Sequence, residues 1–320
     1  MIKIQNDFDS LIFGGSGQDG FFMSRFLIKK KKKILVILRK KDNKYSLLSK
    51  KYKKFIQIKV CKKFTKSNYI NFFKKNIFKN IFFFAGFSKI PHNTNEKKKC
   101  REANYHIFKF LLEACLELKI FPKILYTSSS EIFGTNQKSP KKENSRLKAE
   151  NCYAECKIKS VNLINYYREN HNFFIVNAIC YNHESIFSPN DHLINKIIRL
   201  LKEKKTSSIK IYNSEDIRNI SHAYDFLPIF EKSLIKSKCG DYIFANSQNV
   251  TIKKIINILN KKFNKKIIYS TNKKMRISRT ADNQKLRREF NYSPIYNTRQ
   301  LLTRMLSYSN HRLKLNEIFN

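Results

Sequence analysis

The stretch Ser10-Leu11-Ile12-Phe13-Gly14-Gly15-Ser16-Gly17-Gln18-Asp19-Gly20 decides the fold. A short apolar run ends in a loop whose glycines follow the spacing G-x-x-G-x-x-G, and residues 21–28 then carry apolar side chains at helical spacing. Residues 34–38 are all apolar and predict a second buried strand. The chain therefore begins with a strand, a glycine turn, a helix and a strand.

The glycine loop is informative because the chain has only 7 glycines, and four of them lie in this loop. Glycines here permit a tight turn and a close approach of the backbone to a pyrophosphate at the start of a helix. We expect a dinucleotide to bind at Gly14, Gly17, Gln18, Asp19 and Gly20. Arg39 follows the second strand, where a basic residue suits the extra phosphate of NADP and an acidic residue suits NAD. NADP is therefore the expected cofactor, with NAD as the alternative.

Apolar runs and helical patterns alternate along the first 180 residues. Further strands are expected at 55–60, 81–85, 124–127, 173–179 and 242–245, and helices at about 67–76, 101–118 and 153–170. This alternation predicts an α/β fold with a Rossmann-like, doubly wound parallel sheet. We expect residues 1–180 to form the dinucleotide-binding domain, with a segment at about 216–247 returning to it. Residues 181–320 would mainly form a smaller, interleaved substrate-binding lobe.

Composition excludes several classes of protein. A hydrophobic fraction of 42% argues against a disordered polyelectrolyte, and no apolar run approaches the ~20 residues that span a bilayer. The formal net charge of +41 is spread through nearly every segment, without a nucleic-acid-binding motif, so no specific nucleic acid is expected. The 7 cysteines are odd in number and contain no C-x-x-C pair. They predict reduced thiols in a cytoplasmic protein, with neither a disulfide framework nor a metal site.

Two segments carry candidate catalytic side chains. Tyr153 and Lys157 are four residues apart and would share one face of a helix. A neighbouring ammonium favours the phenolate of a tyrosine and so lowers its pKa toward that of a useful base. Upstream, Ser129 and Glu131 follow a predicted strand, and ligands bind at the carboxyl ends of strands in such sheets.

These segments resemble the extended short-chain dehydrogenase/reductase family of NAD-dependent epimerases and dehydratases, over nearly the whole chain. Within it they are most similar to the GDP-mannose 4,6-dehydratases. The similar segments are Gly15 to Gly20, Ser129 to Gly134, Pro140 with Glu143, Asn182-His183-Glu184-Ser185, Arg218 with Ser221-His222-Ala223 and Asp225, and 281–294.

The resemblance implies a sugar-nucleotide 4,6-dehydratase that acts on GDP-mannose or a similar substrate. Tyr153, supported by Lys157 and Ser129, would take the C4 hydroxyl proton while the cofactor takes hydride. Glu131 would remove the C5 proton, water would leave from C6, and the hydride would return there. By the same resemblance, Ala85, Gly86, Lys157 and His183 would contact the cofactor, and Asn182, Arg218 and Arg279 the substrate. A homodimer or homotetramer without a membrane partner is expected.

Several positions depart from the family pattern. The second Arg after Asn182-His183-Glu184-Ser185, a cofactor-phosphate contact in the family, is Ser188, and the Asp beneath the adenine is Lys63. Glu131 makes a plain epimerase less favoured but also occurs in related decarboxylases and 4-keto reductases. The alternatives are therefore a reductase, epimerase or decarboxylase of nucleotide sugars, or a non-catalytic member that binds a cofactor or a nucleic acid.

Overall fold

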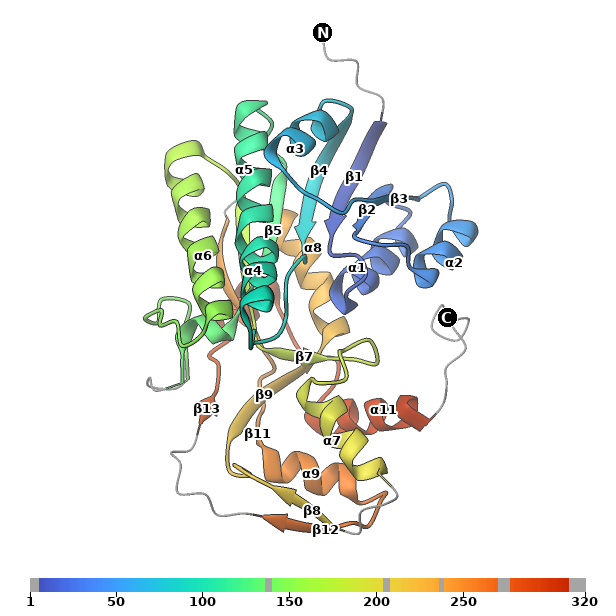
Figure 1. Cartoon of the computed structure of the whole chain (residues 1–320), viewed down its shortest axis with the longest axis vertical. Helices are drawn as coiled ribbons and strands as arrows, with labels where there is room; N and C mark the ends of the chain where they lie inside the picture. Colours follow the sequence, from blue (N-terminus) through green and yellow to red (C-terminus); the bar gives the residue numbers. More distant parts are fainter. Residues whose placement is uncertain (1–5, 136–139, 204–207, 236–238, 270–276, 311–320) are drawn as a thin grey trace. The chain divides into compact units, whose positions relative to one another are not determined.

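The computed structural model describes residues 6–135, 140–203, 208–235, 239–269 and 277–310 (Figure 1). The chain divides into two compact units. The first unit comprises residues 1–134, 145–179 and 227–242, and the second comprises 135–144, 180–226 and 243–320. The segment that returns to the first unit is shorter than the expected 216–247, because the strand that begins at Ile217 pairs within the second unit.

A seven-stranded sheet forms the centre of the first unit. Its strands are β1 (Asn6–Phe13), β2 (Ile34–Leu38), β3 (Ile56–Val60), β4 (Asn76–Phe83), β5 (Lys123–Ser129), β6 (Ile175–Cys180) and β10 (Gly240–Phe244). Their order is β10-β6-β5-β4-β1-β2-β3, and β1 pairs in parallel with both β2 and β4. The order reverses between β1 and β4, which makes the carboxyl ends of these strands the expected ligand crevice. The predicted doubly wound α/β fold is confirmed.

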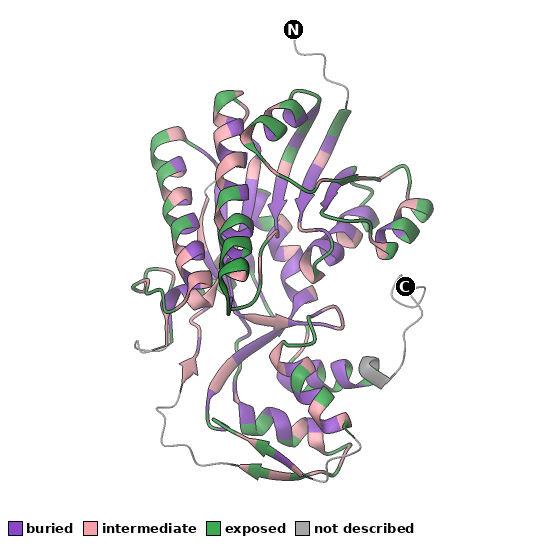
Figure 2. Cartoon of the chain, viewed as in Figure 1, coloured by how far each residue is buried: buried purple, intermediate pink, exposed green. Residues whose placement is uncertain are grey.

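Helices cover both faces of this sheet (Figure 1). They are α1 (Gln18–Lys29), α2 (Asn43–Lys51), α3 (Lys66–Phe73), α4 (Thr94–Arg101), the π-helical η1 (Glu102–His106), α5 (Ile107–Glu117), the 3₁₀ turn η2 (Ser130–Phe133), α6 (Cys152–His171) and α8 (Leu227–Ile235). The core on one face joins the sheet to α3, α5 and α6, where the rings of Phe83 and Phe108 are 4.9 Å apart. On the other face, the ring of the next residue, Phe84, packs against the ring of Phe230 of α8 with their centres 5.5 Å apart. The central strands are accordingly buried along most of their length (Figure 2).

The boundaries of several elements differ from the sequence-based expectations. The helix expected at 67–76 ends at Phe73, and β4 begins at Asn76 rather than at 81. Asn76 explains the early strand start, because it pairs with Asn6 in register and its side-chain amide donates to the Phe72 carbonyl at 2.8 Å. The helix expected at 101–118 begins earlier, at Thr94, and contains the π-helical turn at residues 102–106.

The described part of the second unit has two small sheets, one of four strands and one formed by β8 (Ser208–Ile211) and β12 (Lys266–Tyr269), and an apolar core of its own. The strands of the four-stranded sheet are β7 (Asn182–Glu184), β9 (Ile217–His222), β11 (Asn249–Thr251) and β13 (Ser278–Arg279). Its helices are α7 (Leu193–Lys202), the 3₁₀ turn η3 (Ala223–Phe226), α9 (Ile252–Asn260), α10 (Gln284–Phe290) and α11 (Thr298–Asn310). β9 lies between β11 and β13 and also pairs with β7, while α7, α9 and α11 bury their apolar faces together. Among the described helices of both units, none is long and apolar enough to cross a bilayer.

Candidate active site

The glycine loop between β1 and α1 is packed against backbone on two sides. Gly14 has φ +78°, and a Cβ on it would lie 2.6 Å from the Ala85 nitrogen just beyond β4. A Cβ on Gly20 would lie 2.4 Å from the Gly14 carbonyl oxygen. Glycine is therefore required at both positions, and the loop lies at the point in the sheet where the strand order reverses.

Tyr45 stabilises the glycine loop by a hydrogen bond to its backbone. Its buried hydroxyl donates to the carbonyl of Gly15 at 3.0 Å and lies 2.8 Å from the hydroxyl of Ser24. Burial raises the pKa of Tyr45 far above its usual range, so the hydroxyl remains a donor at any physiological pH. This contact fixes a loop that a Gly-rich sequence would otherwise leave free.

The other expected cofactor residues of the first unit lie along the same end of the sheet. Gly17 is the extended N-cap of α1, where no side chain caps the helix, and Gln18 and Asp19 form its first turn. Arg39 is exposed directly after β2, and the half-buried Ala85 and exposed Gly86 follow β4. All of these positions lie near the carboxyl ends of β1, β2 and β4, where a dinucleotide is expected.

Lys157 and Tyr153 lie on the first turns of α6, which Asn151 caps by accepting from the Ala154 N–H at 2.9 Å. The Lys157 side chain is 4% exposed, and its Nζ donates to the carbonyl of Thr127 in β5 at 2.7 Å. The same Nζ lies 5.9 Å from the centre of the Tyr153 ring. The ammonium is thus held by the end of β5 at a distance from which it can stabilise a Tyr153 phenolate.

Ser129 and Glu131 lie at the carboxyl end of β5. Ser129 is the last residue of the strand and caps η2, accepting from the Glu131 N–H at 3.3 Å. Both side chains are partly exposed. The first unit therefore brings all four candidate catalytic residues to β5, η2 and the start of α6.

Asn104 is a positioning residue that the sequence did not reveal. It is fully buried in the π-helical turn η1, and its side-chain amide accepts from the Phe87 N–H and donates to the Phe87 carbonyl, both at 3.1 Å. A Cβ on Gly86 would lie 2.8 Å from the Asn104 Oδ1 and 3.8 Å from the Lys157 Nζ. Asn104 thus fixes the loop after β4 beside Lys157. One Asn in a chain rich in Asn gave no signal of this role.

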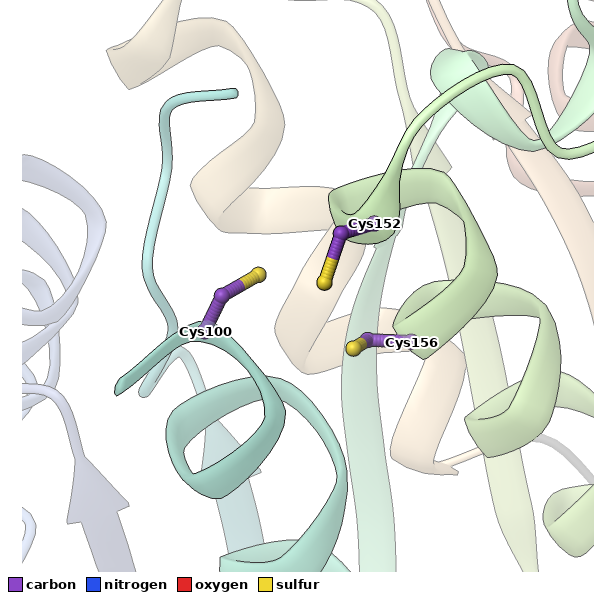
Figure 3. A group of neighbouring side chains, drawn as sticks. All are labelled: Cys100, Cys152 and Cys156. Carbon is purple, nitrogen blue, oxygen red and sulfur yellow. The ribbon is translucent and has the colours of Figure 1, made fainter. Parts of the chain in front are cut away.

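Three cysteines that are separate in the sequence meet next to this site (Figure 3). The Sγ atoms of Cys100, Cys152 and Cys156 all lie within 4.8 Å of one another. Burial raises the pKa of Cys156 to about 12, and the neighbouring thiols add to the shift. The sequence, with no C-x-x-C pair, did not predict this grouping.

In the second unit, two segments that resembled the family are neighbouring strands. β7 pairs with β9 in parallel, and the register places Asn182 beside Ile220, His183 beside Ser221 and Glu184 beside His222. The His183 Nδ1 lies 2.8 Å from the Tyr181 carbonyl oxygen, and because a carbonyl oxygen can only accept, Nδ1 is the donor. Two stretches far apart in the sequence thus form one surface.

Arg218 and Arg279 are also brought together by strand pairing. They are register partners in β9 and β13 and therefore project to the same face of the small sheet. Arg218 donates to the Asp216 carboxylate at 3.0 Å, and burial lowers the pKa of Arg279. Strand pairing thus places two guanidinium groups on one face of the small sheet, and one of them is bound to the Asp216 carboxylate.

The family-like segments of the second unit bury three titratable groups. Burial raises the pKa of Glu184 to about 7 and that of Asp225 to about 6, and it lowers the pKa of His222 to about 4. Glu184 accepts from the N–H of Ile194 at the start of α7 at 3.3 Å. In all three cases desolvation is the largest cause, and it favours the uncharged form of the group.

Comparison with known proteins gives a family match over most of the chain. The model of the family described as GDP-mannose 4,6 dehydratase matches residues 11–305. Among curated proteins, the GDP-mannose 4,6-dehydratase of Vibrio cholerae is 26% identical over 151 residues, which is 46% of this chain and 41% of that protein. The human GDP-mannose 4,6 dehydratase is 24% identical over 42% of this chain and 37% of that protein. The chain thus spans about two fifths of the length of these curated relatives.

Solved structures share the fold over nearly the whole chain. A dTDP-glucose 4,6-dehydratase from Bacillus anthracis in complex with NAD superposes with a TM-score of 0.80 at 16% identity, covering 99% of this chain and 100% of that one. A UDP-glucose 4-epimerase from Thermotoga maritima with UDP-glucose has a TM-score of 0.82 at 14% identity, covering 97% and 100%. At these identities the likeness supports the architecture alone.

Proposed function

The chain belongs to the GDP-mannose 4,6 dehydratase family, and from that premise we propose that it is a nucleotide-sugar 4,6-dehydratase with GDP-mannose as the first candidate substrate. The observation that carries the proposal is the placement of Lys157. Its buried ammonium is fixed to β5 and lies 5.9 Å from the centre of the Tyr153 ring, which supports a role for Lys157 in stabilising a Tyr153 phenolate.

The first unit fits a nicotinamide dinucleotide. The glycine loop has no room for side chains at Gly14 and Gly20, so its backbone can approach a pyrophosphate closely. When bound, the nicotinamide would accept a hydride from the sugar and return it to the same molecule, so that no net oxidation occurs. The exposed Arg39 after β2 supports NADP over NAD, because its charge can pair with the additional phosphate.

The chain's own residues would move the protons. Tyr153 would take the proton of the C4 hydroxyl, with Lys157 stabilising the phenolate and Ser129 hydrogen-bonding the same hydroxyl. Once C4 is a ketone, the C5–H bond is acidic, and the Glu131 carboxylate would remove that proton and pass it to the C6 hydroxyl, which then leaves as water. A phenolate for a hydroxyl and a carboxylate for a carbon acid are matched to the two tasks.

The second unit would bind the nucleotide end of the substrate. Arg218 and Arg279 lie side by side in the β9–β13 pair and can donate several charge-assisted hydrogen bonds to a diphosphate. Asn182 and His183, on β7, would contribute contacts to the substrate and the cofactor respectively.

The purified protein should be incubated separately with GDP-mannose, dTDP-glucose and UDP-glucose, each with NADP⁺ or NAD⁺. Formation of a 4-keto-6-deoxy sugar without net reduction of the cofactor supports the proposal, and the substrate that reacts identifies the nucleotide. Consumption of added NADPH with a 4-keto sugar instead identifies a reductase. An absence of any reaction, together with tight and salt-sensitive RNA binding, would contradict the enzymatic function.

A further inference from the structure

The three-thiol cluster of Cys100, Cys152 and Cys156 lies outside the proposed catalytic machinery and has no role in it. Cys100 lies in the last turn of α4, and the other two lie four residues apart on the first two turns of α6. Figure 3 shows the three sulfur atoms pointing toward one another from these two helices. Three of the 7 cysteines therefore converge on one point, although the sequence separates Cys100 from the other two.

We propose that this cluster is a binding site for a single thiophilic metal cation of the zinc type, held by the three thiolate sulfurs. Zinc–sulfur bonds are about 2.3 Å long, so three sulfurs around one tetrahedral ion are separated by about 3.8 Å. The Sγ atoms lie within 4.8 Å of one another, so small rotations of the side chains would complete the site.

A disulfide is a poorer fit to the same geometry. It requires two sulfurs to approach to about 2.05 Å and leaves the third thiol unused. It also requires an oxidant, whereas cation binding only exchanges the three thiol protons for one metal ion. Three sulfurs in one small volume match the donor set that zinc and Cu(I) select among cations.

The surroundings of the cluster are suited to ligand residues. The Asn104 side chain donates to the Cys100 Sγ at 3.2 Å, and a donor of this kind orients a thiolate ligand and stabilises its charge. Cys100 and Cys156 are at most 2% exposed, whereas Cys152 is partly exposed and offers a path for the ion. A divalent ion with three thiolates carries one negative charge, and the hydrogen bond from Asn104 would help to stabilise it. A fourth coordination position would remain for water or an external ligand.

Metal binding would connect α4 to the start of α6. Tyr153 directly follows Cys152, and Lys157 directly follows Cys156, so the cation would fix the helical turns that carry the proposed base. The site is nevertheless independent of the proposed activity, because it consists of residues that touch neither substrate nor cofactor in that mechanism. Its test therefore measures the metal and not the reaction.

The test uses the full chain, reduced with a phosphine and freed of metal with a chelator. Zn²⁺ is added in competition with a chromophoric chelator, and Cu(I) is titrated in a parallel experiment to decide which cation binds more tightly. We expect one Zn²⁺ per chain. Removing one sulfur in C152S should lower the affinity by at least about 100-fold, because the loss of a direct ligand exceeds the 10–100-fold effect of its supporting contacts. Replacing the partly exposed Cys239, outside the cluster, should leave the affinity unchanged in C239S.

Two further measurements keep the test decisive if one variant folds poorly. Cd²⁺ in place of Zn²⁺ should give a sulfur-to-metal ultraviolet absorption whose intensity falls in both C152S and C156S. Zn²⁺ should also raise the Tm of the wild-type protein and of C239S but not of C152S. Equal metal binding by the wild type and C152S, or no binding by a folded wild type, would overturn the proposal.

Discussion

The two units place their candidate functional residues in different ways. In the first unit these residues lie at the ends of strands: Gly14 after β1, Gly86 after β4, and Ser129 at the end of β5. In the second unit they lie within paired strands, as for Arg218 and Arg279. Residues at strand ends are positioned by their own element, whereas paired residues depend on a partner strand. Substitutions in the first unit should therefore mainly change kcat and the stability of the glycine loop. Substitutions in the second unit should mainly change KM and the pH dependence of stability.

The largest effect is expected for Y153F. Removal of the phenolic hydroxyl should lower kcat by about 10²–10⁴-fold with little change in KM, because a general base acts in the transition state. Y166F is the matched control, since Tyr166 lies on the same helix but is 51% exposed.

In the second unit, by contrast, R279K should mainly raise the KM for the nucleotide sugar. The comparison between the units fails if Y153F changes only KM or if R279K changes only kcat.

The sequence predicts the first unit well for a physical reason. Ile34–Leu38 is a continuous apolar strand, and 153–170 is a long helical pattern, so burial follows directly from the order of residues. The helix α4 (Thr94–Arg101) was not predicted, because its segment is highly polar and lacks an apolar pattern. Its start is instead determined by Asn93, whose side chain accepts from the Glu96 N–H. Local hydrogen bonds of this kind leave little trace in an apolar pattern.

Most of the second unit could not be predicted, because its site depends on strand register. No pattern in the sequence indicates that Glu184 lies beside His222, or that Arg218 lies beside Arg279. The family resemblance identified these segments as important without indicating that they touch. The same limit applies to Cys100, which meets Cys152 and Cys156 only because α4 packs against α6.

The glycine loop should show the largest effect on stability. In G20A the new Cβ would lie 2.4 Å from the Gly14 carbonyl oxygen, and neither backbone can move freely. We expect a loss of about 3 kcal/mol in the free energy of unfolding, together with weaker dinucleotide binding. G17A is the control, because its Cβ would meet only one atom, at 3.3 Å, in an extended backbone, and should cost less than about 1 kcal/mol. Denaturant titration measures both, and equal losses would show that the loop is not packed as described.

A pH-dependent effect is expected in the second unit, at Glu184. Burial raises the pKa of Glu184 in the folded state to about 7, above its ordinary value of 4.5, so the folded state retains a proton that the unfolded state has released. The contribution to stability is therefore complete below about pH 4.5 and is lost as the pH rises through 7. E184Q keeps an oxygen to accept from the Ile194 N–H and cannot ionise, so at pH 8 it should be more stable than the wild type by up to about 3 kcal/mol.

The control for this prediction is internal. His222 and Asp225 titrate in both proteins, so the difference between the two stability curves isolates Glu184. Urea titrations at pH 5, 6, 7 and 8 should show a difference that grows toward E184Q with rising pH. A constant difference across this range would mean that Glu184 is not a buried, protonated carboxyl.

The smallest effect is expected at Arg39, which belongs to the first unit but is exposed. R39D replaces a cation that can pair with the extra phosphate of NADP by an anion that can accept from ribose hydroxyls. Because water screens charges at an exposed site, we expect the ratio of NADP to NAD affinity to fall by only about 10-fold, or about 1.4 kcal/mol. K40D, at the next exposed position, is the control and should change the ratio less. Affinities measured for both cofactors with each variant decide the matter, because equal shifts in R39D and K40D would indicate a general effect of charge rather than a phosphate contact at the end of β2.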